Sequence, residues 1–204
     1  MNKKQLLTLL PILSFIWFFM TIILGGLFYN NYSHISQFIS ELGATGIENG
    51  SLINYLGFIP TQVFLLIFIF LCISVIPKTK TNMTGLFFIA IYAFTLGVAA
   101  VFPCDFECRP KNPSISHLIH IYSAMPGYLC GIVGIFFISS KSKLWTESNF
   151  FMIVSYILVV CALLAFIFLD SEFKIGGAIQ RLLELSIYSW LILFGFYLGK
   201  YETT

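Results

Sequence analysis

The sequence predicts an all-α fold, a single polytopic membrane domain over residues 1–204 in which six transmembrane helices form a bundle and a short amphipathic helix lies at the outer face. Two observations predict it. Of the 204 residues, 58% are hydrophobic and only 10% are charged, whereas about a quarter of a soluble domain is charged. The hydrophobic residues also fall in runs of roughly 20, the length that a helix needs to cross a bilayer.

Six apolar runs define the spans, at about 6–28, 57–76, 85–103, 115–139, 150–169 and 182–199. The first follows Lys3 and Lys4, as the core of a secretory signal peptide would. Its apolar stretch is longer than the roughly 7–15 residues of a signal core, and no small-residue cleavage site follows it. We therefore expect a retained helix.

Lysine and arginine predict the orientation, because loops on the cytoplasmic side carry an excess of both. With a cytoplasmic N-terminus, seven of these residues lie inside and four outside, which favours cytoplasmic N- and C-termini. The net charge of +2 and the absence of a basic cluster exclude nucleic acid as an expected partner, and leave membrane lipid.

Polar chemistry is concentrated on the predicted outer side. All three histidines and seven of the nine acidic residues fall there. Since ionisable groups near membrane depth are candidates for function, this asymmetry points to a site at the outer face.

Residues 33–42 fit a short amphipathic helix, with Ser33 as its N-cap and Gly43 as its stop. Its apolar residues share one face, and His34, Gln37 and Glu41 form an adjoining stripe. The helix could lie flat in the interface, although such helices usually carry lysine or arginine on the wet face. Alternatively, it covers the mouth of the bundle and points His34 and Glu41 inward.

The span 115–139 begins with His117 and His120, one turn apart on one face. Two histidines at this spacing could bind zinc or iron if a third ligand, such as His34 or Asp105, joined them. They could equally be hydrogen-bonded to neighbouring helices.

Arg181 and Glu184 share a face at the outer end of the last span. A charge there should be paired or face a polar cavity. Arg181 is the simplest partner for Glu184, and His120 is an alternative one.

Cys104 and Cys108 lie in the predicted outer loop "FPCDFECRPKNP". A pair at this spacing could form a disulfide in an oxidising compartment. Two metal thiolates are the alternative, which lacks further cysteines nearby.

The stretches "YSHISQFISELGATG", "FPCDFECRP" followed by "SHLIH", and "GGAIQRLLE" come in the order seen in the domain of unknown function 998 family, which this chain resembles over nearly its whole length. The resemblance implies about six membrane helices and a bacterial cytoplasmic membrane, and implies no activity. It marks as positions of interest Ser40, Glu41, Gly43, Cys104, Asp105, Cys108, His117 or His120, and Arg181. "ISELG" is also similar to an element of the Frag1/DRAM/Sfk1 group, some of whose members handle membrane lipids.

Two functions follow as expectations. The first is binding of a lipid headgroup or small amphiphile in an outward-facing polar site, with His34, Ser40, Asp105 and Arg181 as ligand-binding residues. The second is a metal-dependent lipid hydrolase or transferase, with His117 and His120 on the metal and Glu41 or Glu184 as general base. A transporter is disfavoured, because the inner halves of the spans hold almost no ionisable residue.

Overall fold

The structure, a computed structural model, describes residues 2–201, and all regular structure within them is helical. The α-helices are α1 (Lys3–Phe28), α2 (Gly50–Leu52), α3 (Ile59–Ile73), α4 (Lys80–Val101), α5 (Ile115–Ser140), α6 (Asn149–Ile167) and α7 (Gly176–Tyr201). A π-helical segment, η2 (Ile53–Phe58), joins α2 to α3. Short 3₁₀ helices are η1 (Ile39–Gly43), η3 (Phe106–Cys108) and η4 (Ser142–Leu144).

Six of these helical segments are long and apolar enough to cross a membrane, with α2, η2 and α3 counting as one rod from Gly50 to Ile73. This confirms the predicted six-helix bundle. The second and the last spans of the prediction change most: the second begins at Gly50 rather than at 57, and α7 begins at Gly176 rather than at 182. The earlier start of α7 places Gln180 and Arg181 on the helix.

Polar caps explain where several spans begin. Asn2, Thr79, Ser114 and Ser148 precede α1, α4, α5 and α6, and each side chain accepts a hydrogen bond from a backbone N–H three residues later. Such caps satisfy donors that the first turn of a helix leaves without a partner.

The rod from α2 to α3 continues through Pro60 because α1 compensates for the proline. Pro60 has no N–H to donate to the Leu56 carbonyl one turn earlier. That carbonyl accepts a hydrogen bond from the indole N–H of Trp17 on α1, at 2.9 Å. The bond satisfies the carbonyl and fastens the rod to α1.

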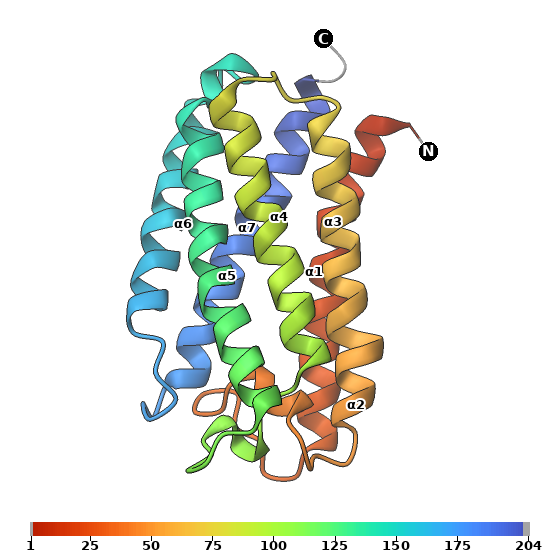
Figure 1. Cartoon of the computed structure of the whole chain (residues 1–204). Helices are drawn as coiled ribbons and strands as arrows, with labels where there is room; N and C mark the ends of the chain where they lie inside the picture. Colours follow the sequence, from red (N-terminus) through yellow and green to blue (C-terminus); the bar gives the residue numbers. More distant parts are fainter. Residues whose placement is uncertain (1, 202–204) are drawn as a thin grey trace.

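The helices form a closed ring in which α1 packs on α3, α3 on α4, α4 on α5, α5 on α6, α6 on α7, and α7 back on α1. Both chain termini lie at one end of the bundle, the upper end in Figure 1. We call this the proximal end, and the opposite end, with the loops 29–49, 102–114 and 168–175, the distal end. The helix α7 is the most buried of the six spans.

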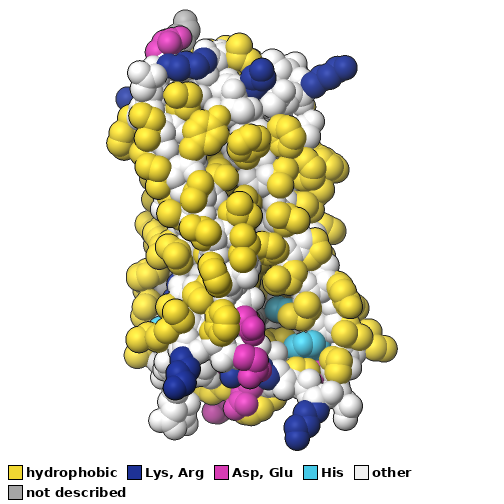
Figure 2. All heavy atoms as spheres, turned by 90° about the vertical axis from the view of Figure 1, so that its left-hand side faces the viewer, with side chains coloured by type: hydrophobic (Ala, Val, Ile, Leu, Met, Phe, Trp, Pro, Cys, Tyr) yellow, Lys and Arg dark blue, Asp and Glu magenta, His cyan; other side chains and the backbone are white. Residues whose placement is uncertain are grey.

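The side of the bundle is covered by exposed apolar side chains, and charged side chains gather at its two ends (Figure 2). An apolar surface this continuous is not stable in water and matches the hydrocarbon of a bilayer. The chain is an integral membrane protein.

The predicted amphipathic α-helix over residues 33–42 is wrong in its secondary structure. Residues 34–37 form a turn and a bend, and only the 3₁₀ helix η1 follows. An α-helix would direct the N–H groups of Phe38 and Ile39 to carbonyls one turn earlier. Here the Phe38 N–H donates to the Glu41 carboxylate and the Ile39 N–H to the Gln180 side chain on α7. Packing against α7 therefore replaces local helix formation.

Candidate ligand site at the distal end

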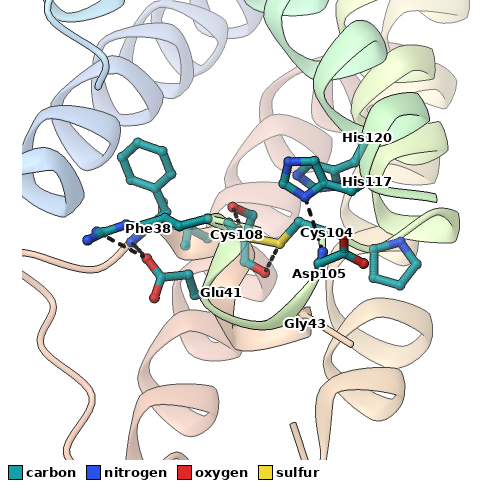
Figure 3. Close-up of a disulfide and its surroundings, with 12 residues drawn as sticks. Phe38, Glu41, Gly43, Cys104, Asp105, Cys108, His117 and His120 are labelled. Carbon is teal, nitrogen blue, oxygen red and sulfur yellow. Dashed lines mark hydrogen bonds and ion pairs between the residues drawn. A yellow bond between two sulfur atoms is a disulfide. The ribbon is translucent and has the colours of Figure 1, made fainter. Parts of the chain in front are cut away.

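The segment 30–49 folds across the distal end of the bundle and carries Glu41 inward. The Glu41 side chain is 1% exposed and accepts hydrogen bonds from the Gln37 amide and the Phe38 N–H, both at 2.9 Å. Arg109 lies 3.9 Å away and forms an ion pair with it (Figure 3). Burial raises the pKa of Glu41 above its ordinary value, although these contacts partly oppose the rise. Glu41 thus fixes the fold of the segment.

The loop 102–108, which contains a disulfide, packs on this segment. Cys104 and Cys108 are bonded, with 5.1 Å between their Cα atoms, so the disulfide expected from the sequence is present in the structure (Figure 3). The Cys108 sulfur lies 3.4 Å from the Ser40 hydroxyl, and the Thr45 N–H donates to the Cys104 carbonyl. The loop and the segment therefore form one cap over the distal end.

Asp105 and His117 have structural partners in this cap. The Asp105 carboxylate accepts from the Ser114 N–H at 2.8 Å, and this bond lowers the pKa of Asp105. The Asp105 N–H lies 3.2 Å from Nδ1 of His117, which must therefore be the unprotonated nitrogen of a neutral ring. These contacts join the loop to the start of α5.

His120 has the opposite tautomer. Its Nδ1 lies 2.8 Å from the Ala99 carbonyl and 3.1 Å from the Phe102 carbonyl. Carbonyl oxygens only accept, so in the neutral ring Nδ1 carries the proton and Nε2 is an acceptor. His120 is buried and lies on α5 one turn after His117, farther from the distal end.

Glu184 is buried at the centre of a hydrogen-bond network. The Tyr92 and Tyr128 hydroxyls each donate to one of its carboxylate oxygens, at 2.8 and 2.7 Å. Gln180 continues the network, because its amide lies 3.4 Å from the Tyr128 hydroxyl and its carbonyl accepts from the Ile39 N–H at 2.6 Å. The network links α4, α5 and α7 to the cap.

A polar cavity of about 60 Å³ lies beside this network. Apolar side chains form part of its lining, and its polar side chains come from the cap, η2, α3, α5 and α7, among them Ser40, Gln62, His120, Gln180 and Glu184. Gln62 is 5% exposed, and its carbonyl oxygen has no hydrogen-bond partner within residues 2–201. A buried acceptor without a donor is rare, so Gln62 marks a place where a donor from outside the chain would bind.

A second cavity, of about 190 Å³, lies between α1 and α7. Its lining is apolar apart from His34, Arg181 and Glu184. Phe18, Ile39 and Glu184 line both cavities, so the two cavities adjoin. We call this second space the α1–α7 groove.

Arg181 is held at the groove by neutral acceptors alone. Its guanidinium donates to the Gln37 and Gly177 carbonyls at 3.0 and 2.9 Å, and to the Tyr32 hydroxyl at 2.7 Å. It also lies 3.0 Å from Nδ1 of His34. Neither predicted partner pairs with Glu184 in the described residues: no ion pair joins it to Arg181, and the His120 ring is hydrogen-bonded to carbonyls.

The predicted site residues therefore divide into three groups. Glu41 and Asp105 lie in the cap, and His117 contacts it from the start of α5; Ser40, His120 and Glu184 line the polar cavity; His34 and Arg181 line the groove. Within residues 2–201, no three His, Cys, Asp or Glu side chains are placed to hold a metal ion together, so the structure gives the predicted metal site no support. Sequence reasoning missed Gln62, Tyr92, Tyr128 and Gln180. The only signal for them was an uncharged polar group within a long apolar run.

Comparison with known proteins gives a family and no activity. No curated protein and no solved structure matches the chain. One family model, described as a protein of unknown function, matches residues 12–197. The match spans nearly the whole bundle and includes both cavities and the cap, so the chain belongs to the DUF998 family of proteins of unknown function.

Proposed function

We propose that this membrane protein binds an amphiphilic lipid at its distal end. The polar end of the headgroup would contact the polar cavity, and the rest of the lipid, with its acyl chain, would lie in the α1–α7 groove. The observation that carries the proposal is that the two spaces adjoin, because they share Phe18, Ile39 and Glu184 as lining residues. A polar space and an apolar space side by side match the two parts of one amphiphile.

The chemistry of the polar cavity indicates a donor-bearing headgroup. The Gln62 carbonyl has no donor within the described residues, and His120 presents an acceptor at Nε2. A hydroxyl or ammonium group would satisfy such acceptors. The volume of about 60 Å³ suits one small polar group rather than a whole lipid, which is why the acyl chain is assigned to the groove.

The test is lipid retention by protein purified in mild detergent and washed to remove loosely bound lipid. Leu185 lines the groove and is 46% exposed, so Leu185→Trp would fill the groove without disturbing the core. We expect this variant to retain at most half of the lipid that the native protein retains, as quantified by mass spectrometry of extracts. Leu182→Trp, at 49% exposure on the same helix and outside both cavities, is the matched control. Equal retention by the two variants, or no lipid on the native protein, would contradict the proposal.

A metal-dependent lipid hydrolase or transferase is the second candidate function. One observation favours it: the acceptor nitrogen of His120 belongs to a side chain that lines the same cavity as Glu184. Elemental analysis of the same preparation tests it. About one zinc or iron ion per chain, lost in the His117→Ala, His120→Ala double variant, is the result that this function requires. Absence of bound metal from both preparations would contradict the metal-dependent function.

A further inference from the structure

We infer that the lipid bound at the distal end is anionic, with a phosphate or similar oxyanion of its headgroup on Arg181 and His34. The inference rests on the proposed function and names the class of lipid that the site selects. It begins from a positive charge, that of Arg181, which no acidic side chain within residues 2–201 neutralises.

Arg181 has no acidic partner among the described residues. The nearest candidates are occupied, because Glu41 pairs with Arg109 and both oxygens of Glu184 accept from tyrosines. The guanidinium contacts two carbonyls, one hydroxyl and one imidazole nitrogen, none of which carries negative charge. A cation near the hydrocarbon is costly unless an anion or water compensates it, so the groove presents a charge that attracts an anion.

The guanidinium is also oriented before any ligand binds. Its Nη1 is held by two carbonyls and its Nη2 by Tyr32 and His34, which leaves the Nε–H without an acceptor in the described structure. The Tyr32 hydroxyl donates in turn to the Phe38 carbonyl at 2.7 Å. A cation fixed by its surroundings loses little conformational entropy when an anion binds, which favours binding.

His34 adds a second donor beside the guanidinium. Burial and the neighbouring Arg181 lower the pKa of His34, and its Nδ1 accepts from Arg181. The ring is therefore neutral, and its proton is on Nε2. The Cε1 and Nε2 atoms of the ring lie close to Gly26 of α1, each 2.7 Å from where a Cβ atom would stand. Arginine and a neutral histidine together suit a phosphate oxyanion, which accepts several hydrogen bonds.

The groove supplies the reason for choosing a lipid over a free phosphate compound. Apart from Arg181 and His34, the groove is lined largely by apolar side chains, among them Phe15, Phe19, Ile23 and Leu185. A soluble phosphate ester would contact the Arg181 charge but would make no contact with these apolar side chains. An acyl chain attached to the same phosphate would use both.

The experiment compares thermal stabilisation of the delipidated protein in detergent by phosphatidylglycerol and by phosphatidylcholine with the same acyl chains. One favourable charge contact near a membrane surface is worth about 1 kcal/mol, so we expect about fivefold tighter apparent binding of phosphatidylglycerol by the native protein. Arg181→Gln should remove the difference, and Arg181→Lys should restore most of it. Lys174→Gln removes a charge at the same end, outside both cavities, and should preserve it.

The outcomes separate this inference from the proposed function. Equal binding of the two lipids by the native protein would overturn the anionic assignment and leave lipid binding intact, a result that does not depend on whether any variant folds. Stabilisation by neither lipid would overturn both. Inorganic phosphate serves as the control ligand without an acyl chain. If it stabilises the native protein as much as phosphatidylglycerol does, the ligand is a soluble phosphate compound and the lipid assignment is wrong.

Discussion

Gln62 and Gln180 carry the same side chain and are both buried, yet their surroundings predict opposite effects of the same substitution. Gln180 accepts from the Ile39 N–H and approaches the Tyr128 hydroxyl, whereas the Gln62 carbonyl has no partner in the described residues. An unsatisfied buried polar group costs about 1–3 kcal/mol. Gln62→Met should therefore raise the melting temperature of the delipidated protein, by about 2–4 °C for each kcal/mol recovered.

Gln180→Met is the matched variant. It should lower the melting temperature, because the buried Ile39 N–H would lose its hydrogen-bond acceptor. Both are measured by thermal unfolding in detergent after lipid removal. A loss of stability in Gln62→Met would mean that the Gln62 carbonyl has a donor even without lipid, such as a buried water molecule.

Glu41 gives a pH dependence whose sign can be worked out. Burial is the largest influence, and it raises the pKa of Glu41 above its ordinary value of 4.5. The folded state thus favours the protonated carboxyl, so the contribution to stability is present below pH 4.5 and is lost as the pH rises through the raised pKa. Relative to Glu41→Gln, the native protein should become less stable as the pH increases upward from 4.5.

The measurement is the difference in melting temperature between the native protein and Glu41→Gln at a series of pH values. Glu48→Gln, at an exposed position of the same segment, provides the background effect of removing one carboxylate. A difference that grows in favour of the native protein with rising pH would show that the bonds from Gln37, Phe38 and Arg109 outweigh burial.

At the scale of elements, the docking of the segment 32–38 on α7 depends on Gly177. A Cβ atom at this position would collide with the backbone of Gln37, which has no flexible end to move away. The close approach allows the Ala178 N–H to donate to the Ile35 carbonyl and Arg181 to reach the Gln37 carbonyl. Gly177→Ala should therefore separate the segment from α7 and weaken both bonds.

We expect Gly177→Ala to destabilise the protein by about 1–3 kcal/mol, as overpacking commonly does, and to reduce the preference for anionic lipid because Arg181 loses part of its support. Thermal unfolding and lipid titration measure the two effects. Gly97→Ala on α4 is the matched control, since its Cβ would meet only ordinary contacts with Gln62. Similar melting temperatures for the two variants would show that the segment adjusts without cost.

Across the whole molecule, the sequence could predict those features that depend on residues close together in the chain. The spans depend on runs of apolar residues, and the disulfide joins cysteines four positions apart, so both could be inferred. The segment 33–42 could not, because its backbone donors are taken by Glu41 and by Gln180 from the far end of the chain. The polar cavity needs side chains from α3, α4, α5 and α7 together, and a single glutamine or tyrosine in an apolar run does not reveal its partners.

Orientation in the membrane is a property of the whole bundle, and two independent features predict the same one. The proximal end carries the larger number of lysines, which favours cytoplasmic termini. The distal end carries the Cys104–Cys108 disulfide, which would persist only on the oxidising, non-cytoplasmic side. Reporter fusions test this, with green fluorescent protein and alkaline phosphatase placed in turn after residue 204 and within the loop 109–113. We expect fluorescence at the C-terminus and phosphatase activity at the loop. The reverse pattern would place the distal end on the cytoplasmic side, where Cys104 and Cys108 would be reduced and the loop 102–108 would lose its internal cross-link.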